Sequence, residues 1–505
     1  MNQSQALSCD LDKPLCNCGV VGIYNHPEAA VQAYYALHAL QHRGQESAGI
    51  VASRPSSSRP GERSFGIHKG HGLVLDVFKD HAVFTDRLRG EHAIGHNRYS
   101  TTGSTIKRAN IQPFYFSSPA IGNLALAHNG NLTNTATLRK ELSEEGAIFQ
   151  TTTDSEMILH LIARSREDTI LKRIREALRR ARGAYSLTIL TDNCLVAARD
   201  PFGFRPLAIG KLGDGYIVAS ETCAFDILQA EYIRDVRHNE IIVIDDETLR
   251  TGEIKSFTID DETPEARHCI FEYIYFSRPD SQIFGHAVDK VRRKLGKNLA
   301  EEAGIRAEDD EKVVVINVPD SSNTATVGYT RVNQDNFAKN SRYEIGLIRS
   351  HYVGRTFISP GQKNREMKVR TKFNVVKGVL EDQKVVVVDD SIVRGTTSKA
   401  LVNMIKGANP KEIHLRVSSP PITHPCLYGM DFPSKEELIA NQHNLDVDSI
   451  RQELGVDTLE YLSENGLLNS APQEEGVGYC TACFTGNYPV QIDLGASKLA
   501  FEEAE

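Results

Sequence analysis

The chain has 505 residues, which is too long for one hydrophobic core and suggests roughly two to four domains. Apolar residues make up 40% and charged residues 25%, a composition typical of globular proteins and unlike that of disordered chains. The net charge of −8 argues against a nucleic-acid-binding protein, and no segment approaches the roughly 18 apolar residues that span a bilayer.

The first 17 residues carry neither an apolar signal-peptide core nor the arginine-rich pattern of a transit peptide. We therefore expect a cytoplasmic, reducing compartment, in which clustered cysteines are catalytic or bind metal rather than form disulfides. Three cysteines crowd this end of the chain, Cys9, Cys16 and Cys18, and a CxxC pair lies near the other end.

Residues 18 to about 257 form short β-rich runs, interrupted by two helical patterns at 29–43 and 154–165. Strands with few helices between them predict layered sheets rather than strict alternation of strand and helix. From about residue 290, helix and strand patterns alternate. The run VVVV at 385–388 is apolar on both faces, which predicts a central parallel strand between helix layers. We place a domain boundary near residue 258, and the tail from about 470 looks loop-like.

The segment VVVVDDSIVRGTTSKAL at 385–401 predicts a ligand site. Its strand ends in Asp389 and Asp390, at the sheet edge where open α/β folds bind ligands. The turn Gly395–Thr397 then offers backbone N–H groups and hydroxyls at a helix N-terminus, which suits a phosphate. The two acids suit ribose hydroxyls, so the segment predicts a grip for ribose 5-phosphate. The alternative interpretation is a helix-capping pair followed by a common turn.

This segment resembles the phosphoribosyl-pyrophosphate (PRPP) motif of type I phosphoribosyltransferases over all 13 positions from Val385 to Thr397. The resemblance implies a parallel sheet flanked by helices, a pyrophosphate loop at VPDSSNTA (318–325) and a cationic lid in the loop 352–374, which could alternatively be a solvated surface loop. It also implies Mg²⁺ near Ser321, Asp389 and Asp390. The PRPP-binding residues implied are Asp320, Ser322, Arg355, Lys372, Asp389, Asp390, Arg394, Gly395, Thr396 and Thr397.

Five clusters in the N-terminal half resemble, in this order and spacing, a class II glutamine amidotransferase domain: CGVVGIY (18–24), QHRGQESAGI (41–50), GHNRYSTTG (95–103), LAHNGNL (126–132) and TTTDSE (151–156). The resemblance implies an N-terminal-nucleophile hydrolase with a four-layer αββα sandwich.

A terminal cysteine carries its own base, because an α-amino group has a pKa near 8 and can take the thiol proton. Cys18 is thus the expected nucleophile. Arg98 would bind the α-carboxylate of glutamine and Asp154 its α-ammonium. Asn129 and Gly130 would form the oxyanion hole.

This interpretation requires that residues 1–17 form a propeptide, removed between Asn17 and Cys18. Two alternatives remain at this stage. Cys16 could be the nucleophile after a different cut, or Cys16 and Cys18 could form a metal or redox site.

Together, the two halves resemble the glutamine phosphoribosylpyrophosphate amidotransferase family. The resemblance implies ammonia transfer from glutamine to PRPP, giving 5-phospho-β-D-ribosylamine, at the start of purine synthesis. It also implies a homotetramer inhibited by purine nucleotides. The alternatives are a PRPP-binding regulatory protein without catalysis and a class II amidotransferase for another acceptor, which would need no ribose-phosphate cradle.

Four cysteines lie far apart in the sequence but could share one metal site: Cys269, Cys426, Cys480 and Cys483. Four thiolates can hold Zn²⁺ or a [4Fe–4S] cluster, and the alternative is four unrelated reduced thiols. The family resemblance favours a structural [4Fe–4S] cluster that pins the tail to the domain junction. The predicted organisation is a propeptide (1–17), an amidotransferase domain (18–258), a phosphoribosyltransferase domain (259–470) and a cluster-bearing tail (471–505).

Overall fold

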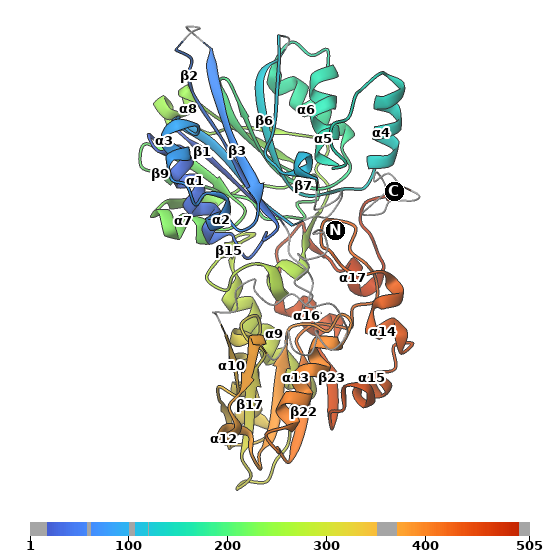
Figure 1. Cartoon of the computed structure of the whole chain (residues 1–505). Helices are drawn as coiled ribbons and strands as arrows, with labels where there is room; N and C mark the ends of the chain where they lie inside the picture. The colour runs from blue at the N-terminus through green and yellow to red at the C-terminus, as the bar shows by residue number, and fades with distance from the viewer. Residues whose placement is uncertain (1–17, 58–61, 100–106, 120, 351–370, 494–505) are drawn as a thin grey trace, which may run out of the picture.

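The computed structural model describes residues 18–57, 62–99, 107–119, 121–350 and 371–493 (Figure 1). Two bodies follow one another along the chain. The first, blue to green in Figure 1, contains two antiparallel sheets, and the second, yellow to red, contains a parallel sheet. The predicted propeptide and most of the predicted cationic lid, including Arg355, lie outside the described residues.

The first sheet of the N-terminal body has seven strands in the order β11-β9-β10-β1-β4-β2-β3, all antiparallel to their neighbours. Its strands are β1 (Gly19–Tyr24), β2 (Ser47–Pro55), β3 (Arg63–His71), β4 (His92–Arg98), β9 (Ala208–Leu212), β10 (Gly215–Ala219) and β11 (Glu231–Asp235).

The second sheet has six strands in the order β13-β12-β8-β7-β6-β5, again all antiparallel. Its strands are β5 (Phe114–Ser118), β6 (Gly122–Leu132), β7 (Gly183–Thr191), β8 (Cys194–Arg199), β12 (Glu240–Asp245) and β13 (Lys255–Thr258). The boundary near residue 258 stays a prediction, and β13 ends at that position.

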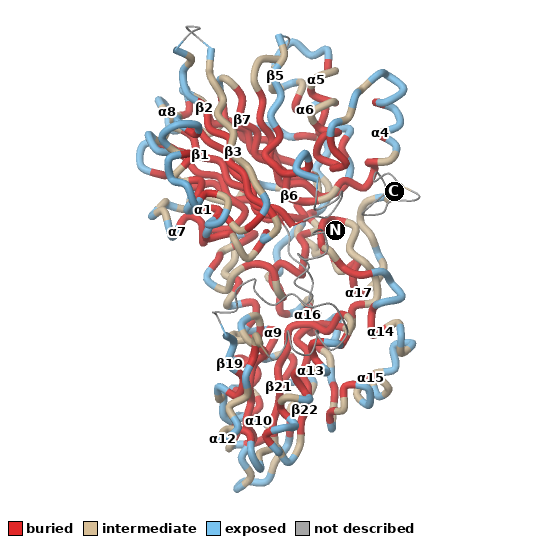
Figure 2. Tube along the Cα trace, viewed as in Figure 1, coloured by how far each residue is buried: buried red, intermediate tan, exposed pale blue. Residues whose placement is uncertain are grey.

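The N-terminal body is a four-layer αββα sandwich with an apolar cluster between each pair of adjacent layers. The two sheets pack face to face through side chains such as Val20 and Ile94 from one and Ala125 and Leu195 from the other. The outer face of the seven-stranded sheet is covered by α1 (Ala29–Ala39), α2 (Val74–Val77), α3 (Ala82–Asp86) and α7 (Cys223–Leu228). The outer face of the six-stranded sheet is covered by α4 (Thr135–Glu144), α5 (Ser155–Arg164) and α6 (Ile170–Arg180). The predicted sandwich is confirmed, and Figure 2 shows its buried strands.

The C-terminal body is built on a five-stranded parallel sheet in the order β18-β17-β21-β22-β23. The strands are β17 (Val313–Asn317), β18 (Ser341–Tyr343), β21 (Lys384–Asp389), β22 (Glu412–Val417) and β23 (Thr458–Tyr461). A separate antiparallel pair contains β19 (Leu347–Arg349) and β20 (Phe373–Val375).

The valine run 385–388 lies on β21, and the prediction of a strand covered by helices on both faces is confirmed. Val386 and Val388 pack in one apolar cluster with α9 (Val288–Ala303) and α10 (Asn323–Asn336). Val385 and Val387 pack in another with α13 (Thr396–Lys406) and α15 (Val447–Leu454). Because successive side chains of a strand point to opposite faces, one apolar run serves both helix layers.

The tail, expected to be loop-like, contains a strand and a short helix. β24 (Val477–Cys480) pairs in parallel with β14 (Ala266–Cys269), and α17 (Ala482–Thr485) follows. The chain then returns to the N-terminal body, where the amide of Asp493 donates to the carbonyl of Thr133 at 3.1 Å. Within the described residues, no helix is both long and apolar enough to cross a membrane.

The remaining short elements connect these layers: α8 (Asp246–Thr251), β15 (Gln282–Ile283), β16 (His286–Ala287), α12 (Lys377–Leu380), α14 (Ile439–Gln442) and α16 (Glu464–Ser470), with one-turn helices η1 (Arg108–Asn110) and η3 (Lys435–Glu437).

Candidate active sites

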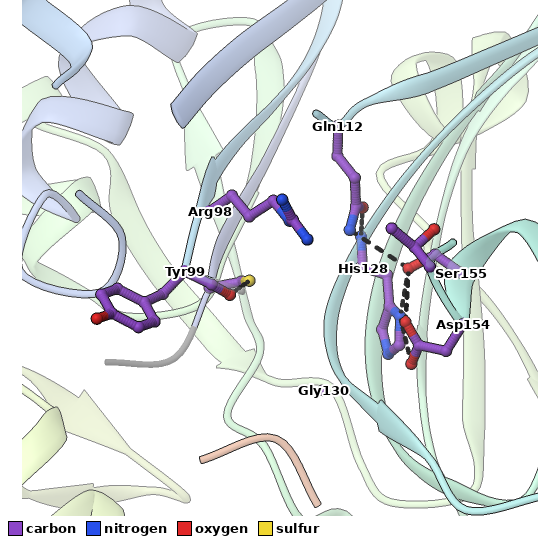
Figure 3. Close-up of a pocket in the computed structure, with 9 residues that line it drawn as sticks. Arg98, Tyr99, Gln112, His128, Gly130, Asp154 and Ser155 are labelled. Carbon is purple, nitrogen blue, oxygen red and sulfur yellow. Dashed lines mark hydrogen bonds and ion pairs between the residues drawn. The ribbon is translucent and has the colours of Figure 1, made fainter. Parts of the chain in front are cut away.

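One small pocket brings together four of the five residues predicted for glutamine hydrolysis (Figure 3). Cys18 immediately precedes β1, Arg98 ends β4, Gly130 lies on β6, and Asp154 caps α5. Both sheets and one helix of the sandwich therefore contribute to a single site. Its other lining residues are Tyr99, Gln112, His128, Thr153 and Ser155.

The thiol of Cys18 is buried and protonated in this environment. Its Sγ donates to the carbonyl of Tyr99 at 3.2 Å, and only 5% of the residue is exposed. Burial raises the pKa of the thiol to about 11, because the charged thiolate is poorly solvated there. At neutral pH the thiol therefore needs a local base before it can act as a nucleophile.

The two residues predicted for the oxyanion hole lie side by side on β6. Gly130 has a φ of 146°, and a Cβ at this position would collide with the carbonyl oxygen of Ala184. Asn129 is buried but is not among the pocket's lining residues. Within the described part of the chain, its Nδ2 has no hydrogen-bond partner. A buried amide donor without a partner is unfavourable, so this atom is chemically suited to donate a hydrogen bond to a ligand oxygen.

Three residues that the sequence did not single out connect the walls of the pocket. The Gln112 side chain accepts from the amide of His128 at 2.8 Å and donates to Ser155 Oγ at 3.3 Å. Ser155 Oγ also lies 2.9 Å from His128 Nδ1 and 3.3 Å from Asp154 Oδ1. This network holds the Asp154 carboxylate toward the pocket. His128 and Ser155 adjoin predicted residues in sequence, whereas Gln112 lies in none of the motifs.

The second predicted site lies where β17 and β21 end. Because the two strands are parallel neighbours, their carboxyl ends share one edge of the sheet. Ser321, which follows β17, donates to Asp390, which follows β21. Ser322 Oγ lies 3.4 Å from Asp389 Oδ1, and both aspartates are buried. The structure thus places the predicted pyrophosphate loop beside the paired acids.

The predicted phosphate cradle begins at Gly395, which has a φ of 78° and caps the 11-residue helix α13. This positive φ favours glycine, and a Cβ at Gly395 would also displace the end of the Ile439 side chain. The backbone amides of Thr396 and Thr397 then start the helix, where an anion is favoured.

The other described residues predicted to bind PRPP contact partners within the protein. Arg394 forms an ion pair with Glu437 at 3.0 Å, and Asp320 pairs with Arg349 at 2.9 Å. Arg349 was not singled out from the sequence. Lys372 directly precedes β20, and its carbonyl accepts from the amide of Ser350 at 2.7 Å.

The four predicted cluster cysteines lie on three segments that are distant in the sequence. Cys269 and Cys480 are register partners on β14 and β24, and Cys483 lies on α17. Burial, together with the neighbouring thiols, raises the pKa of Cys269 and Cys483, and burial raises that of Cys480 to about 12. Cys426 is among those neighbouring thiols. In the described residues, however, no three Cys, His, Asp or Glu side chains are spaced closely enough to hold a metal ion.

The two folds and their sites define a glutamine amidotransferase joined to a phosphoribosyltransferase. Residues 96–226 match a family described as glutamine amidotransferase domain. The chain is 48% identical to the amidophosphoribosyltransferase of Bacillus subtilis (strain 168), over 94% of each chain. It is 46% identical to that of Archaeoglobus fulgidus, over 94% of this chain and 98% of the relative. The chain belongs to the amidophosphoribosyltransferase family.

Two solved structures share the whole fold. One is described as the allosteric regulatory enzyme of purine biosynthesis, with a TM-score of 0.86, 46% identity and coverage of 97% of this chain and 99% of that one. The other is the B. subtilis glutamine PRPP amidotransferase complexed with ADP and GMP, with a TM-score of 0.84, 46% identity and coverage of 95% and 99%.

Proposed function

We propose that this chain hydrolyses glutamine at Cys18 and adds the released ammonia to C1 of PRPP. The products are glutamate, pyrophosphate and 5-phospho-β-D-ribosylamine, at the first step of purine biosynthesis. The observation that carries this proposal is the pocket that joins Cys18, Arg98, Gly130 and Asp154, in one chain with the paired acids of β21. A PRPP-binding regulator without catalysis would not need such a pocket.

The glutaminase step follows from the groups around Cys18. Arg98 binds the α-carboxylate of glutamine, and Asp154 binds its α-ammonium. The free α-amine of Cys18 takes the thiol proton, and the sulfur attacks the side-chain amide carbon. The Gly130 N–H and the Asn129 amide stabilise the oxyanion. Ammonia leaves with the transferred proton, and water then hydrolyses the thioester to glutamate.

The transfer step takes place beside Asp389 and Asp390. The nitrogen of ammonia forms a bond to C1 of the ribose while the bond from C1 to the pyrophosphate oxygen breaks. The two carboxylates hold the ribose hydroxyls, and the amides at the start of α13 bind the 5-phosphate. The oxygen donors Ser321, Asp389 and Asp390 suit Mg²⁺, which would neutralise charge on the departing pyrophosphate.

Residues 1–17 are, in this proposal, a propeptide whose removal frees the α-amine of Cys18. The high pKa of the buried thiol supports this assignment, since the protein offers a sulfur that is inert without a base.

We also propose the finer properties that the family resemblance implies. Purine nucleotides inhibit the enzyme, which is a cytoplasmic homotetramer. A B. subtilis relative solved with ADP and GMP supports nucleotide binding.

A [4Fe–4S] cluster held by the four cysteines completes the proposal, and its role is structural. Thiolates are the ligands of iron–sulfur clusters, and β14, β24 and α17 carry three of the four buried or half-buried thiols, of which Cys269 and Cys480 are register partners. Anaerobically purified protein should contain about four iron and four sulfide per chain. Cys480→Ser should lose both and unfold at a lower temperature, whereas Cys194→Ser, at a buried thiol outside the set, should keep them. Wild-type protein without iron or sulfide would contradict the assignment.

The overall reaction is tested by product stoichiometry. With glutamine, PRPP and Mg²⁺, purified protein should release glutamate and pyrophosphate in equal amounts, measured by coupled assays. With ammonium salts in place of glutamine, it should release pyrophosphate alone. Pyrophosphate formation that depends on neither nitrogen source would contradict the proposed function.

A further inference from the structure

Four charged side chains form a fully buried cluster where the N-terminal sandwich meets the C-terminal body. This junction ion cluster consists of Arg43, Arg205, Glu221 and Glu272, each with 0% of its side chain exposed. Glu272 accepts from Arg43 through both carboxylate oxygens, at 2.7 and 3.0 Å, and lies 3.3 Å from Arg205. Arg43 also contacts Glu221. Two positive and two negative groups balance, as buried charges require.

One residue of the junction ion cluster, Arg43, contacts the backbone of Cys18. Arg43 Nε donates to the carbonyl oxygen of Cys18 at 3.2 Å. Glu272 accepts from the two Nη atoms of the same guanidinium, so both contacts form together. Cys18 directly precedes β1 and lies outside the register that pairs β1 with β4, which begins at Gly19. Once residues 1–17 are removed it would be the chain terminus, and termini fray unless they are tied down.

Glu272 itself is oriented from the C-terminal side of the junction. It begins a short π-helical segment, η2 (Glu272–Phe276), that precedes α9. Ser277 Oγ donates to it at 2.8 Å, and its partner Arg205 donates to the carbonyl of Tyr428 at 2.7 Å. Burial opposes ionisation of Glu272 and by itself would raise the pKa of its carboxyl. The positive charges of Arg43 and Arg205 have the larger effect and keep this pKa below its usual range.

We propose that Glu272 is a positioning residue for the glutaminase, which acts through Arg43 to fix the backbone of Cys18. This inference rests on the proposed function. The terminal amine and thiol of Cys18 must hold one mutual geometry for proton transfer and attack. The Tyr99 carbonyl holds the thiol, and Arg43 holds the backbone carbonyl of the same residue. Glutamine binding, in contrast, belongs to Arg98 and Asp154 on other elements, so Glu272 should affect kcat and not KM.

The test compares two nitrogen donors in the same protein. Glu272→Gln keeps the shape of the side chain but removes its charge, so Arg43 is no longer held by a carboxylate fork. Glutamine-dependent kcat should fall at least about tenfold, with KM for glutamine within about twofold of wild type. Ammonia-dependent synthesis, which bypasses Cys18, should stay within about twofold and report that the C-terminal site is folded.

A control separates positioning from the general loss of a buried carboxylate that binds both Nη atoms of an arginine. Glu240 is also buried and accepts from both Nη atoms of Arg234, at 2.8 and 2.9 Å, in the same N-terminal body. Glu240→Gln should leave the ratio of glutamine- to ammonia-dependent kcat unchanged. A second readout is the rate at which iodoacetamide alkylates Cys18 as a function of pH, followed by mass spectrometry. Its pH profile should shift in Glu272→Gln and not in Glu240→Gln.

Arg43→Lys provides a second variant if Glu272→Gln does not fold. It retains the cluster's charge balance but loses the planar fork, so the same selective fall is expected. An unchanged donor ratio, or an equal loss with both donors, in the variant that folds would overturn the inference. Wild-type protein that uses ammonia but not glutamine would instead overturn the proposed function.

Discussion

Protein that retains residues 1–17 should hydrolyse glutamine at less than about one-thousandth of the rate of protein that begins at Cys18. The uncut chain has an amide nitrogen where the cut chain has an amine, and an amide accepts no proton at neutral pH. With a thiol pKa of about 11, only about one molecule in 10⁴ would carry a thiolate at pH 7. Ammonia-dependent synthesis should be equal in the two forms, because it does not use Cys18.

The two forms can be separated and identified by intact mass before the assay. For the cut form, the glutaminase rate should rise with pH through the pKa of the α-amine, about 8, because the neutral amine is the active base. Any residual rate of the uncut form should follow its thiolate fraction, so it should keep rising with pH and should not level off above pH 8. Comparable glutamine hydrolysis by both forms would exclude the terminal amine as the base.

Asp390→Asn should lower synthesis about 10²- to 10³-fold with either nitrogen donor. Asp390 is buried at the end of β21, where Ser321 and Ser391 donate to its two oxygens. Hydrogen bonds to a charged group contribute about 1.5–3 kcal/mol each, so losing one or two to the ribose, with any Mg²⁺ contact, accounts for this range. Initial rates of pyrophosphate release with glutamine and with ammonia provide the measurement.

Asp382→Asn serves as the matched control for this variant. Asp382 is an exposed aspartate of the same body with a φ of 56°, a conformation that asparagine also adopts readily. Its activity should stay within about twofold of wild type. If Asp390→Asn lost activity with glutamine alone, the paired acids would not belong to the ribose site.

Local patterns made the PRPP site predictable from sequence. Four valines, two aspartates and a glycine-containing turn follow one another without a gap, so strand, carboxylates and helix start are all encoded within 385–401. The prediction of the glutaminase residues depended on a family resemblance, because Cys18, Arg98 and Asp154 lie on or next to separate elements.

What the sequence could not reveal depends on long-range contacts. Gln112 has no motif of its own and acquires its role by facing His128 and Ser155. Arg43 and Glu272 are 229 residues apart and would look like ordinary surface charges in isolation. The tail was expected to be loop-like because its Pro- and Gly-containing composition hides a strand whose partner, β14, comes much earlier in the chain.

The pairing of β24 with β14 also bears on how the enzyme is made. The strand that completes the junction is among the last segments to be translated, whereas Cys18 is among the first. The Tyr428 carbonyl that orients Arg205 is likewise translated late. An N-terminal sandwich that folded during synthesis would lack the contact from Tyr428 to Arg205 until the C-terminal body had been made. A nascent chain would then not hydrolyse glutamine until its C-terminal body has been synthesised.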